Sequence, residues 1–71
     1  MAFRKGSKVA WDWGNGTAIG KIVEVYHEKV TLTLKGAEVT RNASAEAPAF
    51  RIKQDDGAEV LKSASEVRTP S

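Results

Sequence analysis

Two tryptophans separated by one aspartate are the residues of this chain whose type and spacing best suit ligand binding. The stretch WDWGNG, Trp11 to Gly16, joins them to a turn signal, because glycine and asparagine tolerate the positive φ angles of tight hairpins. An exposed indole ring can stack on a base or on a cation. The same two rings can also fill the interior of a small fold. The stretch therefore leaves two interpretations open, a ligand platform and a hydrophobic core.

Few residues suit catalysis or metal binding. The chain has one histidine, His27, and no cysteine, which excludes a thiolate zinc site and a disulfide framework. Asp55 and Asp56 stand together before Gly57, and this pair fits turn chemistry rather than the ligand spacing of a calcium loop. A chain of 71 residues that fills its interior with side chains leaves little room for a concave reaction site. We expect a protein that is not an enzyme, with no catalytic residue, no cofactor and no bound metal.

Hydrophobic alternation predicts the strands that must position these residues. Apolar and polar side chains alternate with a period of two, which is typical of half-buried strands. The alternation and the turn signals between the runs predict five short strands, at residues 8–13, 17–27, 29–34, 49–54 and 58–62. No amphipathic helix of useful length accompanies them. The pattern predicts an all-β fold, a small five-stranded barrel in which closure hides most strand edges.

The second predicted strand changes face midway. Ile19 and Ile22 lie on opposite faces of a regular strand, although both are apolar. A bulge or a strong bend between Gly20 and Val23 would reconcile them, as in a long strand that serves both sides of a small barrel. The sequence therefore predicts an irregularity at this point.

Two segments do not alternate. The stretch 35–48 is polar and alanine-rich, so we expect a long excursion with 37–41 as an optional short strand. The C-terminal residues predict a short helical turn capped by Ser63 or Ser65. Val67 is expected to follow this turn as a lid on the core.

The predicted strands bring apolar side chains to one interior. We expect a single domain over residues 1–71, with its folded core between about residues 5 and 67. Trp11 lies mid-strand and is assigned to the core, whereas Trp13 lies beside the turn and is assigned to the rim. The expected core comprises Val9, Trp11, Ile22, Val25, Val30, Leu32, Leu34, Phe50, Ile52, Val60 and Leu61.

Charge and hydropathy limit the functional classes. The chain has 11 basic and 9 acidic residues, for a net charge of +2, and the two signs are interspersed. Charge alone therefore does not indicate a nucleic-acid partner, which usually requires a clustered basic face. No segment approaches the ~20 apolar residues of a membrane span, and no apolar run of signal-peptide length follows the amino terminus. We expect no membrane association and a cytoplasmic location.

Three blocks of sequence carry a family resemblance. They are KGSKVAWDWGNG with the following GKIVEV, then TRNASAEAPAF, and finally QDDGAEVLKSASEV. Together they resemble the hypervirulence-associated protein family with a Tudor-like domain, over the chain from about Lys5 to Val67. The resemblance implies an SH3-like, Tudor-like barrel and no established activity, cofactor or substrate. Tudor-like domains at large hold methylated cations in a cage of about four aromatic rings, but residues 35–48 contain none, so a complete cage is not expected.

Two functional hypotheses follow. The first is a protein-interaction module that binds through a shallow rim at Trp13, with Asp12 on the opposite face of the strand and Tyr26 expected as the nearest ring. The candidate ligand-binding residues are Trp13, Tyr26, Asp12, Arg51 and Lys53. The second is a nucleic-acid-binding barrel, in which Arg51 and Lys53 on an outward face contact phosphates while Trp13 or Tyr26 stacks on a base. The lysines expected near that face are Lys21, Lys29 and Lys35.

Self-association is a further expectation. A barrel of this size has little stability to spare, so a second subunit could complete its core. The excursion 35–48 could then act as a hinge. The sequence therefore suggests a homodimer with exchanged strands.

Overall fold

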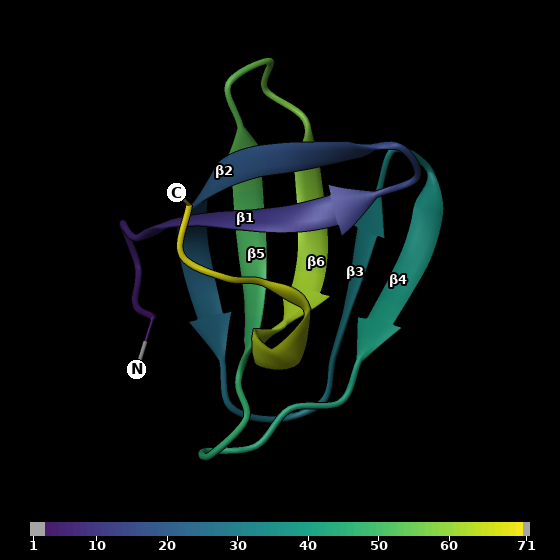
Figure 1. Cartoon of the computed structure of the whole chain (residues 1–71). Coiled ribbons are helices and arrows are strands. Elements are labelled where there is room, and N and C mark those ends of the chain that lie inside the picture. The colour runs from purple at the N-terminus through teal and green to yellow at the C-terminus, as the bar shows by residue number, and fades with distance from the viewer. Residues whose placement is uncertain (1–2, 71) are drawn as a thin grey trace.

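The computed structural model describes residues 3–70, and this part of the chain contains six strands and one turn of 3₁₀ helix (Figure 1). The predicted all-β, barrel-like fold is confirmed. The predicted count of five strands is wrong by one, because the optional segment 37–41 is a full strand. In chain order the elements are β1 (Lys8–Trp13), β2 (Gly16–Tyr26), β3 (Val30–Leu34), β4 (Ala37–Arg41), β5 (Ala49–Gln54), β6 (Glu59–Ser63) and η1 (Ala64–Glu66).

Four of the strands form a curled antiparallel sheet in the order β1-β2-β5-β6. The curl carries β1 across β5 and β6, as Figure 1 shows. The C-terminal segment then pairs with β1, because the N–H groups of Ala10 and Arg68 each donate to the other's carbonyl oxygen at 2.8 Å. This bridge covers part of the edge of β1 that β2 leaves free, and so extends the curled sheet toward a barrel.

Strand β2 bends where the sequence predicted an irregularity. Its first half pairs with β1 and its second half with β5, and the register with β5 shifts between Ile22 and Glu24. The bulge predicted between Gly20 and Val23 is therefore confirmed. Gly20 lies at the bend, and a methyl group in place of its hydrogen would lie 2.5 Å from Ile52 Cγ2 and 3.2 Å from the Trp11 ring. Only glycine permits this close approach of the two layers.

One hydrophobic cluster lies inside the curl. Trp11, only 3% exposed, packs there with residues from β1, β2 and β5, and the predicted lid Val67 covers them. Phe3 adds a ring whose centroid lies 6.0 Å from that of Phe50, edge to face. The buried members of the cluster are Val9, Trp11, Ile22, Phe50, Ile52 and Val67, and Val25 and Val60 pack against them.

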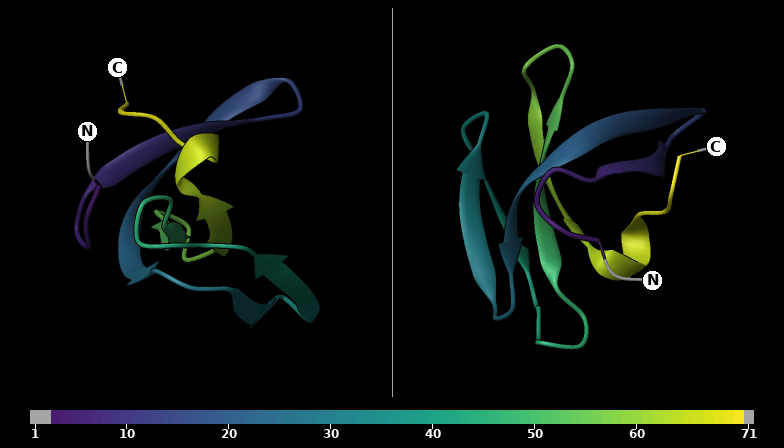
Figure 2. Two further views of the ribbon diagram at one scale, coloured as in Figure 1. Left: turned by 90° about the horizontal axis from the view of Figure 1, so that it is seen from below. Right: turned by 90° about the vertical axis from the view of Figure 1, so that its left-hand side faces the viewer.

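Four residues of the predicted core lie outside this cluster. Leu61 is buried, at 2% exposed, but is not among its members. Val30, Leu32 and Leu34 are only half-buried, because β3 pairs with β4 alone and the two form a separate hairpin. Figure 2 shows this hairpin on one side of β5 and β6, with the β1–β2 hairpin on the other side. The alternation in β3 correctly indicated an apolar face, but that face covers the outside of the curled sheet rather than its interior.

Glu66 links the β3–β4 hairpin to the end of β6. Its Oε1 accepts hydrogen bonds from Arg41 Nε at 2.9 Å and from the Ser63 N–H at 2.8 Å, and its Oε2 lies 3.9 Å from Lys62 Nζ. Burial of the carboxyl would by itself raise the pKa of Glu66, but the hydrogen bonds from Arg41 and Ser63 and the charges of Arg41 and Lys62 lower it below its ordinary value. The short helix starts after Ser63, as predicted.

Replacing Trp11 by alanine is expected to lower the free energy of unfolding by about 3–5 kcal/mol, because it removes a large buried ring from the only extensive cluster found in residues 3–70. Urea denaturation followed by circular dichroism measures the change. Trp13→Ala is the matched control and should cost less than about 1 kcal/mol, because that ring is 61% exposed. Equal losses in the two variants would contradict this division.

Glu66→Gln is expected to lower the melting temperature at pH 7 but not in acid. A carboxyl whose pKa is depressed in the folded state stabilises the fold above its unfolded pKa of about 4.3, and this contribution is lost as the pH falls through the lower folded pKa. Melting curves of parent and variant between pH 7 and pH 3 should therefore converge. Glu46→Gln, which changes an exposed carboxylate in the loop after β4, should melt like the parent throughout.

The strand-exchanged homodimer stays a prediction, although its hinge becomes shorter. Residues 37–41 are paired with β3, so residues 42–48 are the connection that could open and let β5 and β6 pair with β2 of a second copy. Light scattering over a wide concentration range should then show a growing dimer fraction. A constant monomer mass at millimolar protein would contradict the prediction.

Candidate functional site

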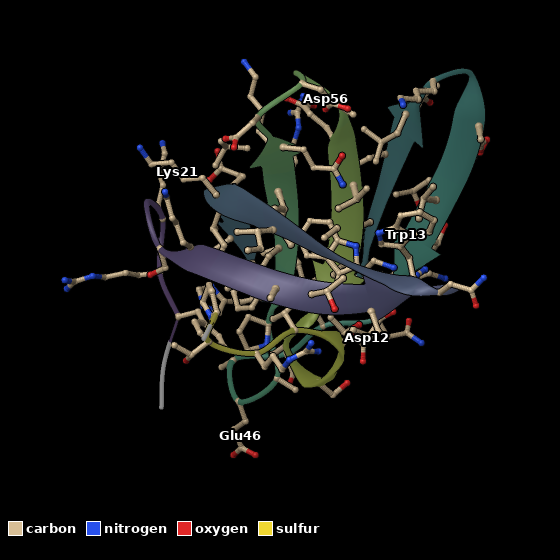
Figure 3. The ribbon with its side chains drawn as sticks, turned by 45° about the horizontal axis from the view of Figure 1, so that its top comes forward. Asp12, Trp13, Lys21, Glu46 and Asp56 are labelled. Atoms are coloured by element: carbon tan, nitrogen blue, oxygen red, sulfur yellow. The ribbon has the colours of Figure 1, made fainter. Side chains whose placement is uncertain are left out.

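Trp13 lies at the tip of the β1–β2 hairpin and is largely open to solvent. It ends β1, pairs with Gly16 at the start of β2, and is 61% exposed, whereas Trp11 is 3% exposed. Both rings lie on the same face of β1, since they are two residues apart. Figure 3 labels Trp13 near the tip of the β1–β2 hairpin. The predicted assignment of Trp11 to the core and of Trp13 to the rim agrees with these exposures.

The indole of Trp13 rests on its own hairpin. A methyl group placed on Gly16 would lie 3.3 Å from the ring carbon Cζ2 and 3.7 Å from Nε1. The ring therefore lies against the backbone of the neighbouring strand, where a side chain would push it away. One side of the indole is supported and much of the rest is free, which restricts its rotamers before any ligand arrives.

Asp12 lies on the opposite face of the same strand. Its Oδ1 accepts hydrogen bonds from Arg68 Nη2 at 2.9 Å and from Thr17 Oγ1 at 3.3 Å. The hydrogen bond from Arg68 and the charge of its guanidinium hold the pKa of Asp12 below its ordinary value. Asp12 therefore connects the hairpin to the C-terminal segment that bridges to β1, and it is not part of the Trp13 surface.

Tyr26 does not lie near Trp13, so the predicted proximity of these two rings is wrong. Tyr26 ends β2 and pairs with Ala49, whereas Trp13 pairs with Gly16 at the other end of the same strand. Ten residues of extended chain separate the two ends, or roughly 30 Å of strand. The β1–β2 hairpin uses only the first half of β2, and the prediction extended that pairing along the whole strand.

The basic residues predicted to contact phosphates are only partly brought together. Arg51 donates to Glu59 Oε1 from Nε at 2.8 Å and from Nη2 at 2.6 Å, and the hydrogen bond and charge of Glu59 raise the pKa of the guanidinium. Lys53 is exposed and lies directly opposite Lys21 on β2. Arg51 is therefore neutralised by its own partner, while the two lysines share one face of the sheet.

Of the other two predicted lysines, Lys35 lines a shallow hollow together with Arg51, whereas Lys29 lies away from it. Lys29 immediately precedes β3 and Lys35 immediately follows it, so they lie at opposite ends of that strand, in the separate hairpin. Neither Trp13 nor Tyr26 pairs beside Lys21 or Lys53 in the sheet. The surface predicted for nucleic acid is thus not assembled as proposed from the sequence.

The two larger hollows formed by distant parts of the described chain were not predicted. One, of about 300 Å³, lies between the β3–β4 hairpin and β6 and has Leu34, Val39 and Val60 among its lining residues. The other, of about 410 Å³, is lined by Phe3, His27, Glu46, Pro48 and Phe50 together with Ala45 and Ala64. Each joins segments that no local pattern connects, so neither hollow could be predicted from the sequence.

Residues 3–70 contain no group of three or more histidine, cysteine or acidic residues placed to hold a metal ion. Within the same residues, no side chain that is polar or charged is buried. No helix in this part of the chain has both the length and the apolar character needed to cross a bilayer. The surface features of residues 3–70 that could recognise a ligand include the exposed indole, the hollows and the exposed charges.

Comparison with known proteins agrees with the resemblance seen in the sequence. Residues 6–67 match the family model described as the TUDOR domain of hypervirulence associated proteins. Neither the curated proteins nor the solved structures give a significant match. The matched range spans every strand of the structure, from β1 to β6, together with the short helix and Val67.

Proposed function

Because the chain belongs to the family of hypervirulence associated proteins with a TUDOR domain, we propose that it is a small non-enzymatic module that binds a protein partner through the surface around Trp13. The family supports a binding module in general terms. The exposed indole at the tip of the β1–β2 hairpin is the observation that carries the finer statement. It is the most exposed of the large hydrophobic side chains in residues 3–70.

An exposed, supported tryptophan suits a protein interface. Tryptophan is enriched among the residues that contribute most to binding, where its burial against a partner commonly contributes 2 kcal/mol or more. The contact between the ring and Gly16 fixes the indole in advance, so less side-chain entropy is lost on binding. The surface of the hairpin tip is otherwise small and polar, with Gly14 and Asn15 in the turn. We infer a modest contact with one anchor rather than an extended apolar interface.

The placement of the rings favours single-ring contact over an aromatic cage. Trp11 and Phe50 are buried, Tyr26 ends the far half of β2, and Phe3 packs edge to face on Phe50. Trp13 is thus left to act by itself. A single indole attracts a cationic or apolar side chain of a partner with about 0.5–2 kcal/mol, so the interaction is expected to be weak.

Catalysis receives no support from the described residues. General acid and base groups need a concave site that shifts their pKa and excludes water. In residues 3–70 the depressed pKa values belong to Asp12 and Glu66, and both carboxylates are engaged by arginines that connect parts of the fold. These groups stabilise the structure, which is consistent with a binding module.

Trp13→Ala is expected to weaken selective peptide binding without unfolding the protein. Peptides of twelve residues would be selected from a displayed random library on the parent protein and then titrated against ¹⁵N-labelled parent and variant. Loss of the anchor should weaken binding about 10- to 30-fold. In the parent, the indole N–H signal of Trp13 should shift on titration while that of Trp11 stays in place.

Ile19→Ala is the matched control for this experiment. Ile19 is 50% exposed and pairs with Ala10, so it lies on the other face of the same hairpin. Its truncation should leave peptide binding unchanged. Gly16→Ala should weaken binding by displacing the indole it touches. Equal affinity of the selected peptides for the parent and a folded Trp13→Ala variant would overturn the proposal.

A further inference from the structure

Three lysines stand side by side across the curled sheet. Lys8 on β1 pairs with Lys21 on β2, and Lys21 pairs in turn with Lys53 on β5. Residues directly opposite each other in antiparallel strands project from the same face, and neighbouring strands are about 4.8 Å apart. All three residues are exposed. They form one continuous row of positive charge, here called the lysine row.

The fold does not neutralise this row. Like charges placed directly opposite each other destabilise a sheet. None of the three lysines takes part in an ion pair among residues 3–70. Glu59 lies opposite Lys53 on β6, but both hydrogen bonds that its Oε1 accepts come from Arg51. Asp56, in the turn after β5, instead accepts the N–H of Ala58.

The N-terminal segment adds charge at the same end of the sheet. The Gly6 N–H donates to the Ile22 carbonyl oxygen at 2.8 Å, and the Ile22 N–H donates to the Ser7 carbonyl oxygen at 2.9 Å. These two hydrogen bonds hold the N-terminal segment beside Ile22, which directly follows Lys21. The exposed Arg4 and Lys5 directly precede Gly6. This end of the sheet therefore gathers five of the 11 basic residues in a chain of net charge +2: Arg4, Lys5, Lys8, Lys21 and Lys53.

We propose that the lysine row binds the phosphate backbone of a nucleic acid. The row is linear and regularly spaced, which suits a polymer with a negative charge at every unit. No aromatic ring pairs beside these lysines, so the contact is expected to be electrostatic and independent of base sequence. Among residues 3–70, Ile19 is the one large exposed apolar side chain on the same face, which is too little to anchor the protein in a lipid surface.

This surface is separate from the one around Trp13. Lys8 and Trp13 lie at opposite ends of β1, and their pairs with Lys21 and Gly16 lie on opposite faces of the hairpin. Figure 3 shows the labelled Lys21 and Trp13 far apart on the molecule. The inference therefore does not rest on the proposed peptide-binding function, and either can fail without the other.

The test compares two double variants that each remove two positive charges. Lys21→Gln/Lys53→Gln breaks the row, and Lys29→Gln/Lys35→Gln changes lysines of the separate β3–β4 hairpin. Binding of a fluorescein-labelled 20-base-pair DNA duplex would be followed by anisotropy between 50 and 200 mM NaCl. The row variant should bind at least 10-fold more weakly than the parent at 50 mM. The control should lose no more than about 3-fold, as expected for a change in net charge alone.

The salt dependence gives a second readout. Three to five phosphate contacts predict a slope of log Kobs against log[NaCl] of about −3 to −4.5 for the parent, and removal of two contacts should make the slope shallower by about 2. The row variant should also melt at the same temperature as the parent or higher, because it removes like-charge contacts.

Three results would overturn the proposal. One is the absence of measurable duplex binding by the parent at 50 mM NaCl. Another is an equal loss of binding in the two double variants. The third is binding of the parent to phosphatidylserine vesicles or to a polyglutamate peptide with none to the duplex, since that would assign the row to a different anionic partner.

Discussion

The contact of Trp11 with Gly20 is the constraint on which the rest of the structure depends. The two layers of the curled sheet approach each other so closely there that a methyl group on Gly20 would meet Ile52, the Lys53 carbonyl and the indole at once. This approach lets β2 leave the β1 layer and enter the β5 layer within a few residues. A core of few residues becomes continuous only because one large ring spans the space between the layers.

The position of Trp13 follows from that same contact. Strand β1 is anchored at Trp11, and the two residues that follow continue past the covered region into the hairpin turn. The strand pairing with β2 keeps this extension ordered, and the hydrogen bond from Arg68 to Asp12 connects it to the C-terminal segment. The exposed indole is therefore presented by a braced hairpin, which gives a rigid support to a binding residue.

Much of the fold could be predicted because its signals are local. Alternation identified β1, β3 and β5, the turn signal at Asp56 and Gly57 identified β6, and the change of face between Ile19 and Ile22 identified the bulge. The errors arose where a partner had to be known. Alternation shows that Leu32 and Leu34 share an apolar face, but it cannot show that β3 pairs only with β4, outside the main core. The distance between Trp13 and Tyr26 likewise depends on how far the pairing of β1 extends along β2.

The candidate site residues also differ in whether the sequence alone could predict them. Trp13 could be recognised from sequence, because an aromatic residue beside a glycine-rich turn is a local feature. The alignment of Lys8, Lys21 and Lys53 could not, since these residues are far apart in the chain and meet only through the registers of two strand pairs. A net charge of +2 with interspersed signs conceals this alignment in the composition. Charge clustering in a small β fold is thus a property of register rather than of sequence order.

The length of the β1–β2 pairing and the alternation of its faces keep the two surfaces apart. Gly16 supports the indole at one end of the first half of β2, and Lys21 lies at the other end of that half, on the opposite face. A ligand on one surface therefore leaves the other sterically open, while the continuous pairing of β1 with β2 holds them at a fixed separation. A fold with one small core can in this way carry two surfaces of different chemical character, an apolar ring and a row of ammonium groups. Neither requires a buried pocket, which a chain of 71 residues could form only by giving up part of that core.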